Sequence, residues 1–135
     1  MSKSGSGLFK HTSGANEALV QELIDSGEKC TPKNIVGITK DSHGKIVWLE
    51  TGTKSAGLNH IIEEHGTQFS QKGISNQEIP NYIMEAVSQG EIVGYQRSRT
   101  IYEFTYEGKT QRIAVQISEN GYIVGANPKS MKGVK

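Results

Sequence analysis

The sequence predicts an α+β domain in which N-terminal helices pack on an antiparallel meander sheet of four to five strands. Two observations support this fold class. Three segments before residue 90 have apolar residues at helical spacing, whereas after residue 90 the chain holds only strand-like segments and tight turns. Glu107-Gly108 and Asn120-Gly121 are two-residue turn sequences that favour hairpins, because they tolerate the positive φ that such turns require.

The length and composition favour one domain without a membrane segment. At 135 residues the chain is long enough for one hydrophobic core, and we expect one domain over residues 13–128. Residues 1–12 are rich in Ser, Gly and Lys and are predicted to be a flexible tail, as are residues 129–135. No apolar run approaches the roughly 20 residues that cross a bilayer, so we expect neither a secretory signal nor a membrane anchor.

Charge and cysteine content exclude some classes of function. The formal net charge of +1 is too small for a protein that holds duplex DNA through its phosphates. It still permits an enzyme that binds one or two phosphates with a few placed cations. Cys30 is the only cysteine, which excludes an internal disulfide and a zinc site of several thiolates.

The first half of the chain is predicted to contain a helix and a hairpin. The helix begins at about Ala15, after a cap at Ser13, and ends at Gly27, because apolar residues between them follow helical spacing. Residues 34–39 and 45–50 are β-branched runs on either side of a polar, Gly-containing loop, and they predict a hairpin.

Two more helices are expected before residue 90. Residues 58–66 have helical spacing, and Gly66 is predicted to end this helix in the left-handed position. Ser75 and Glu78 form a capping-box pattern just before Pro80, so the next helix is expected over residues 80–89.

Four strands are predicted after Gly90, and the two turns fix their register. The first turn would place Glu103 opposite Arg112, and the second would place Ile117 opposite Val124. The predicted strands cover residues 91–96, 100–106, 109–118 and 122–127. The predicted core face carries Tyr102, Phe104, Ile113, Val115, Ile117, Val124 and Ala126. The opposite face carries Glu103, Thr105, Arg112, Gln116, Ser118 and Asn127, with Ile101, Ala114, Ile123 and Gly125 between them.

The polar face of the predicted sheet has two interpretations. Glu103 and Arg112 can be an ordinary cross-strand ion pair, as expected on a half-exposed antiparallel sheet. Alternatively, Arg112 binds a phosphate, Glu103 or a histidine takes a proton, and Asn127 holds a nucleotide. The residue pattern alone does not choose between them.

His60 and His65 are candidate acid–base residues, because imidazole has an unperturbed pKa of about 6.5. Each also has a structural interpretation, since His65 falls on the apolar stripe of its helix and His60 can pair with Glu64 on the surface. Their i, i+5 spacing differs from the i, i+4 spacing of zinc-protease helices, so we expect no metal site.

Three cations lie in predicted loops beside these elements, and two of them form a compact turn. These cations are Lys54, Arg97 and Arg99, and the turn is Arg97-Ser98-Arg99-Thr100. Such a turn is usually solvated, but at the edge of the polar face it would supply charge that stabilises a pentacoordinate phosphate.

Four segments resemble the C-terminal toxin domains of bacterial polymorphic toxins and the related phage-borne nucleases, the barnase/EndoU/colicin/RelE-like (BECR) group. They are residues 58–66, 79–87, 99–104 and 120–128. The segments follow the order of the family, and the resemblance covers roughly residues 54–128. It implies helices packed on a four- or five-stranded antiparallel sheet that binds RNA on its exposed face.

The resemblance also implies a reaction and a set of residues. A ribose 2′-hydroxyl would attack the adjacent phosphorus of an RNA, tRNA among the candidates, and leave a 2′,3′-cyclic phosphate without a metal or other cofactor. His60 and His65 match the helix motif of the family. Arg99, Thr100 and Tyr102 match the strand motif that follows it, and Arg112 and Asn127 match the last two strands. The expected catalytic residues are His60, His65, Arg112, Glu103 and Tyr102. The expected substrate-binding residues are Lys54, Arg97, Arg99, Thr100 and Asn127.

A toxin of this kind would act in the cytoplasm as part of a larger phage or toxin protein, and an inhibitor protein or delivery out of the cell would protect its producer. A competing interpretation is a non-catalytic appendage of a phage structural protein that binds a partner through the same polar face. A third class, a metal hydrolase or small-molecule enzyme, would need a cluster of ligands or a deep pocket, and the sequence indicates neither.

Overall fold

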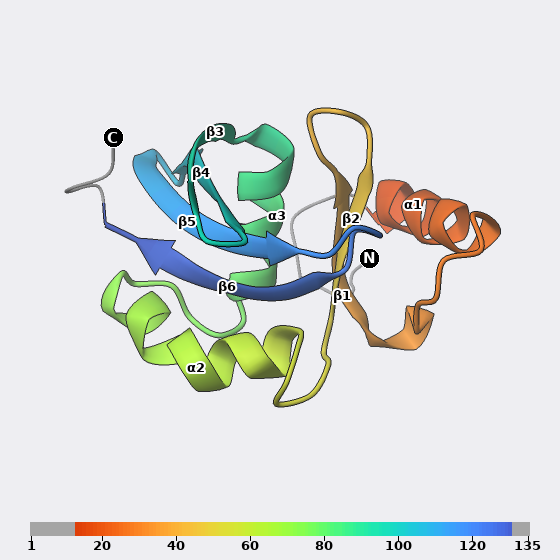
Figure 1. Ribbon diagram of the computed structural model, residues 1–135, viewed down its shortest axis with the longest axis horizontal. Coiled ribbons are helices and arrows are strands. Elements are labelled where there is room, and N and C mark those ends of the chain that lie inside the picture. The colour runs from red at the N-terminus through yellow and green to blue at the C-terminus, as the bar shows by residue number, and fades with distance from the viewer. Residues whose placement is uncertain (1–12, 131–135) are drawn as a thin grey trace.

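The computed structural model describes residues 13–130, so the predicted tail at residues 1–12 and the end of the second tail lie outside the described residues. The fold is α+β, with helices packed on antiparallel sheets, as the sequence predicts (Figure 1). Strands β3, β4, β5 and β6 form one four-stranded sheet in that order, and β1 and β2 form a separate two-stranded sheet. The elements are α1 (Ser13–Asp25), β1 (Ile35–Lys40), β2 (Ile46–Glu50), α2 (Leu58–Gln71), α3 (Ile79–Gln89), β3 (Glu91–Gln96), β4 (Arg99–Tyr106), β5 (Lys109–Ile117) and β6 (Ile123–Lys129), with a short 3-10 turn, η1 (Pro32–Asn34), before β1.

The main core lies on one face of the four-stranded sheet, which we call the inner face. Helix α3 lies behind this face and contacts β4 and β5, while α2 runs along the edge strand β6 (Figure 1). The ring of Tyr82 on α3 packs edge-on against Phe104 and Tyr106 of β4, with centroid distances of 4.9 and 4.8 Å. Such contacts between aromatic rings add to the burial of their apolar area.

The β1–β2 hairpin separates the main core from a second, smaller one. Val47 and Leu49 face the main core, whereas Trp48 faces the small core with Ile38 and Leu23 of α1. Alternate side chains of one strand point to opposite sides, so a hairpin that is buried on both sides reads as a continuous apolar run. The Trp48 amide also donates to the Gly121 carbonyl (3.0 Å), which joins the hairpin to the start of β6.

The first predicted hairpin register is confirmed. Glu103 lies opposite Arg112, and Tyr102 lies opposite Ile113. Glu107 and Gly108 both have positive φ, at 51° and 83°, which is the geometry of a two-residue turn that matches strand twist.

The second predicted register is wrong next to its turn and correct farther away. The Ser118 amide donates to the Tyr122 carbonyl, which leaves a three-residue loop, and Ile117 lies opposite Ile123 instead of Val124. A bulge at Val124 then restores the predicted pairing of Val115 with Ala126. Ile123 consequently belongs to the buried core and not to the polar face.

Two predicted element boundaries are also wrong. Helix α2 continues through Gly66 to Gln71, and the left-handed residue that ends it is Gly73, with φ of 82°. Strand β6 continues through Pro128 to Lys129, because an edge strand tolerates a proline that donates no ladder hydrogen bond.

Candidate functional site

The outer face of the four-stranded sheet, opposite the main core, carries most of the predicted polar residues. Register places Glu103, Arg112 and Lys129 in one row across β4, β5 and β6. Both Nε and Nη2 of Arg112 donate to Oε2 of Glu103, at 3.1 and 3.0 Å. This pair is partly buried, so solvent screens it less than a fully exposed pair.

Arg99 extends from β4 across β5 to reach β6 on the same face. Its Nη1 donates to Oδ1 of Asn127 at 2.8 Å. A Cβ added to Gly125 would lie 3.1 Å from Nη2 of Arg99, so the guanidinium lies directly against the glycine backbone. Burial lowers the pKa of the Arg99 guanidinium, which nevertheless stays a cation at neutral pH.

Helix α2 carries both candidate histidines, and it is tied to the sheet at its start. The Gly57 amide donates to the Val124 carbonyl at the β6 bulge (3.0 Å), so His60 is within one helical turn of a contact with β6. Nδ1 of His60 lies 2.7 Å from the Lys54 carbonyl, which can only accept. Nδ1 therefore carries the proton in the neutral ring, and Nε2 carries the lone pair.

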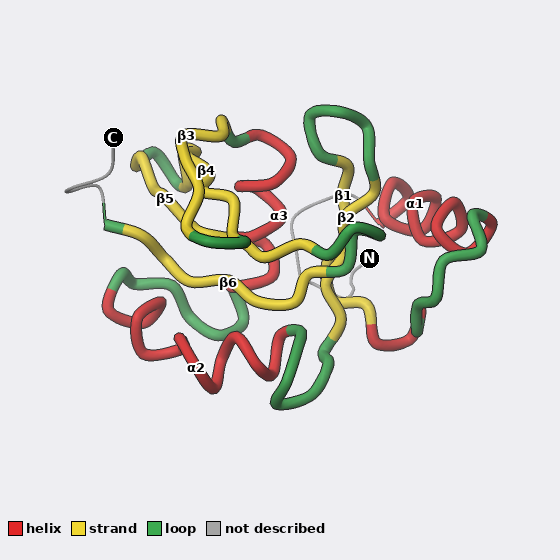
Figure 2. Tube along the Cα trace, viewed as in Figure 1, coloured by secondary structure: helices red, strands yellow, loops and turns green. Residues whose placement is uncertain are grey.

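The loop between β2 and α2, green in Figure 2, holds the Lys54 carbonyl in place. Gly52 and Gly57 have positive φ, at 67° and 92°, and a Cβ at Gly52 would overlap the Ala56 carbonyl. Nδ2 of Asn59 donates to the Gly52 carbonyl (3.2 Å), so α2 is hydrogen-bonded to this loop by two side chains of its first turn.

His65 has a similar but weaker support. Its Nδ1 lies 2.8 Å from Oε1 of Gln68, three residues further along α2. The side-chain oxygen of Gln68 belongs to a longer and more mobile group than a backbone carbonyl, so it fixes the ring less firmly.

Two predicted site residues of the sheet lie on its inner side. Tyr102 faces the main core and is only 7% exposed, and burial raises the pKa of its hydroxyl. Thr100 pairs with Val115 and points to the same inner side. Arg97 lies exposed in the β3–β4 turn with a φ of 55°, and the Lys54 side chain is exposed in its loop.

Sequence reasoning missed two residues of the outer face that matter for the site. Lys129 falls in the tail predicted from the sequence, whereas it is the last residue of β6. Gly125 was assigned to the face without a role, because nothing in the sequence shows that a side chain from β4 would lie against it.

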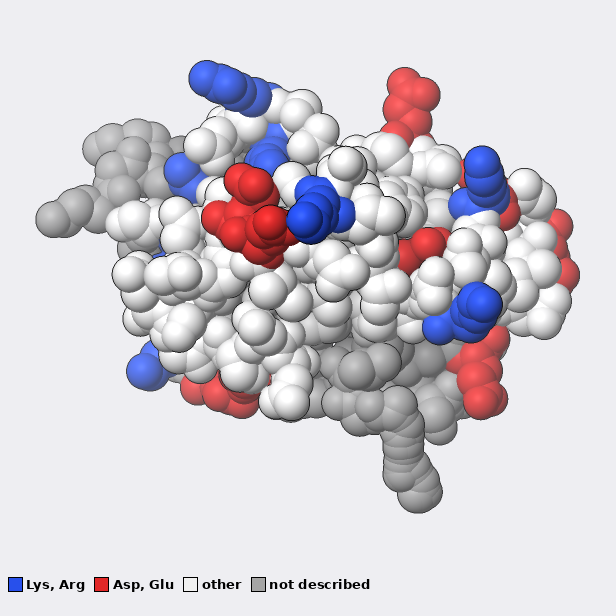
Figure 3. All heavy atoms as spheres, turned by 90° about the horizontal axis from the view of Figure 1, so that it is seen from below, with Lys and Arg blue, Asp and Glu red and all other residues white. Residues whose placement is uncertain are grey.

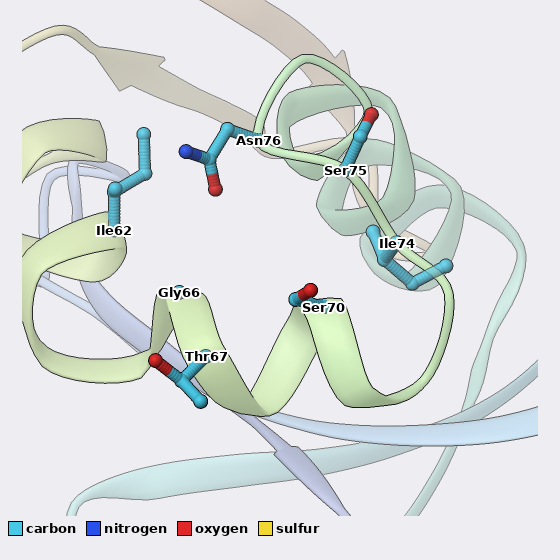
Figure 4. A pocket seen from close by; sticks show the side chains of 7 residues that line it. All are labelled: Ile62, Gly66, Thr67, Ser70, Ile74, Ser75 and Asn76. Atoms are coloured by element: carbon cyan, nitrogen blue, oxygen red, sulfur yellow. The ribbon is translucent and has the colours of Figure 1, made fainter.

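A cleft of about 420 Å³ lies between α2 and the connection to α3 (Figure 4). One wall is α2, and the other is the segment that carries Ile74, Ser75 and Asn76. Its lining is neutral, and it contains none of the predicted catalytic residues. The lining residues are Ile62, Gly66, Thr67, Ser70, Ile74, Ser75 and Asn76.

Charge is mixed on the side of the molecule that Figure 3 shows, where acidic and basic side chains are interspersed among neutral ones. Any anion binding there would have to rest on a few placed cations. Within residues 13–130, no three His, Cys, Asp or Glu side chains gather closely enough to hold a metal ion. No helix in the same part of the chain is long and apolar enough to cross a membrane.

No protein-family model matches the chain, and a comparison with curated proteins found no relative.

Proposed function

We propose that this chain is a metal-independent endoribonuclease that cleaves RNA on the outer face of its four-stranded sheet. The observation that carries the proposal is the gathering of Arg99, Arg112 and Glu103 on that face, with Asn127 beside them. Arginines stabilise the charge of a pentacoordinate phosphate, and a carboxylate or an imidazole moves the proton.

The reaction needs one base and one acid. The base takes the proton of the ribose 2′-hydroxyl while its oxygen forms a bond to phosphorus, and the bond from phosphorus to the 5′-oxygen breaks. The acid protonates that leaving oxygen, and the products are a 2′,3′-cyclic phosphate and a free 5′-hydroxyl. Atoms and charge balance without an oxidant or a metal.

We assign the base to His60. Its Nε2 lone pair is available, because the Lys54 carbonyl holds the proton of the neutral ring on Nδ1. The Glu103 carboxylate is already engaged by two donors of Arg112, so we assign it the role of orienting that arginine.

The test is incubation of the purified protein with total RNA and with a tRNA pool in EDTA. We expect cleavage that leaves 2′,3′-cyclic phosphate ends. His60→Ala should reduce the rate by about 10²–10⁴-fold, the usual contribution of a general base. His43→Ala is the matched control, because His43 lies exposed in the β1–β2 loop. This variant should cleave RNA like the wild type. Circular dichroism would confirm that each variant is folded.

Two outcomes would overturn the proposal. RNA that stays intact across a range of pH would favour a non-catalytic module that binds a partner through the same face. Cleavage by folded His60→Ala at the same rate as the wild type and His43→Ala would show that the reaction does not depend on the assigned site.

A further inference from the structure

Arg99 is the cation on the outer face that most needs an anion. Its guanidinium is partly desolvated, and its hydrogen bond goes to the neutral carboxamide of Asn127. Arg112 differs, because the carboxylate of Glu103 neutralises it. Within the described part of the chain no carboxylate pairs with Arg99. Removing a charge from water without a counter-ion is costly, so this position favours an anionic ligand.

The guanidinium of Arg99 lies over Gly125, a position without a side chain. From β4 the side chain passes over β5 before it reaches Asn127 on β6, and on β5 Ala114 lies opposite Asn127 while Gln116 lies opposite Gly125. At its far end the guanidinium lies on Gly125, where a Cβ would approach three of its atoms, Nη2 at 3.1 Å, Cζ at 3.5 Å and Nη1 at 3.6 Å. A side chain at Gly125 would lift the guanidinium off the sheet.

We propose that Arg99, Asn127 and Gly125 form a binding site for a phosphate group, and that this phosphate site exists only because residue 125 is a glycine. Asn127 occupies one N–H of the guanidinium and fixes its orientation, which leaves Nε and Nη2 to donate to phosphate oxygens. The inference rests on the proposed function in one respect only: if the protein cleaves RNA, the phosphate bound at this site is the scissile phosphate of the RNA. It moves the main phosphate contact from Arg112, the residue that the sequence favours, to Arg99.

The experiment titrates the full chain with inorganic phosphate, with uridine 3′-monophosphate and with uridine, and follows the Arg99 Nε–H signal by NMR. Inorganic phosphate and the nucleotide should both shift the signal, and uridine should not. A greater affinity for the nucleotide than for inorganic phosphate would identify RNA as the source of the ligand, and equal affinities would identify a site for free phosphate.

Gly125→Ala should weaken phosphate binding by about tenfold or more, the effect of losing one charge-assisted hydrogen bond. Gly94→Ala is the matched control. Gly94 lies on the same sheet face, opposite Ile101, and a Cβ there would meet Ile101 Cδ1 at an ordinary 3.9 Å. Gly94→Ala should therefore bind phosphate like the wild type.

Asn127→Asp keeps the shape of the phosphate site and pairs the guanidinium of Arg99 with a carboxylate. It should abolish phosphate binding without loss of thermal stability, a combination that a purely structural role for Asn127 does not produce. This variant also keeps the test decisive if Gly125→Ala does not fold.

Phosphate binding that is unchanged in Asn127→Asp, or no binding of either phosphate by the wild type, would overturn the inference. The inference and the proposed function can fail separately. If phosphate binds at Arg99 but RNA stays intact, only the nuclease fails. If the wild type cleaves RNA and the folded Asn127→Asp variant cleaves it at the same rate, only the proposed phosphate site is wrong.

Discussion

Glu50 is a buried carboxylate that accepts two hydrogen bonds through one oxygen. The side chain of Trp48 donates Nε1–H to Oε2 at 3.0 Å, and the Thr31 amide donates to the same oxygen at 2.9 Å. Glu50 is 8% exposed and Trp48 is fully buried, so water cannot readily replace this acceptor for the Trp48 indole. The residue therefore holds the segment before β1 against the end of β2.

We predict that Glu50→Ala lowers the free energy of unfolding by about 2–4 kcal/mol, because two donors lose their acceptor. Glu50→Gln should cost less, since a carboxamide oxygen in the same place can still accept. Urea unfolding followed by Trp48 fluorescence measures both variants. Equal stabilities of the wild type and Glu50→Ala would contradict this account of the carboxylate.

Single residues of the site differ in how far the sequence predicts them. The pairing of Glu103 with Arg112 follows from the Glu107-Gly108 turn, since a turn that requires two positive φ angles fixes the register on both sides. The contact of Arg99 with Asn127 does not follow from register, because register alone does not show that a guanidinium from β4 lies against Gly125 on β6.

At the scale of elements, α2 ends at a different glycine from the one that the sequence predicts. Gly66 and Gly73 both follow helical residues, but only Gly73 is followed by an apolar residue that can close the cap. Ile74 donates its amide to the Phe69 carbonyl (2.9 Å), and both side chains are buried in the main core. Tertiary burial of Ile74 therefore decides where the helix ends.

Gly66→Ala should stabilise the protein by up to about 1 kcal/mol, because alanine is the better residue in a helix interior. A Cβ there would meet Ile62 and Asn76 at 3.5 and 3.6 Å, which is ordinary contact. Gly73→Ala should destabilise it by a similar amount or more, since its φ of 82° strains an L-residue. Urea unfolding of the pair tests this, and a loss of stability in Gly66→Ala would show that the cleft beside it does not admit a methyl group.

The Asn120-Gly121 turn shows a second limit at this scale. The same dipeptide fits a two-residue loop and the last part of a three-residue loop that ends in a left-handed glycine. The structure has the second form, in which the Gly121 amide donates to the Ser118 carbonyl and Gly121 has a φ of 104°. A Cβ at Gly121 would overlap the Ile46 carbonyl, so the close approach of β2 selects this loop. That approach is a long-range contact, which local sequence does not encode.

For the whole molecule, the two cores hold different sets of elements together. The main core joins α2, α3 and the inner face of the four-stranded sheet, and the proposed site lies on the opposite face of β4, β5 and β6. The small core holds α1 against the outer side of the β1–β2 hairpin, chiefly through Leu23. The ion pair between Lys40 and Glu22 adds little, because both side chains are largely exposed.

This division predicts that Leu23→Ala releases α1 without unfolding the sheet. The substitution should cost about 2–5 kcal/mol of local stability, because Leu23 is only 2% exposed and its loss leaves a cavity beside Trp48 and Ile38. Amide hydrogen exchange should then become faster over residues 17–25 and stay slow in β4 and β5. RNA cleavage, if the proposed function holds, should persist. A uniform increase of exchange across α1 and the sheet would instead mean that the two cores unfold as one unit, and that the site depends on the packing of α1.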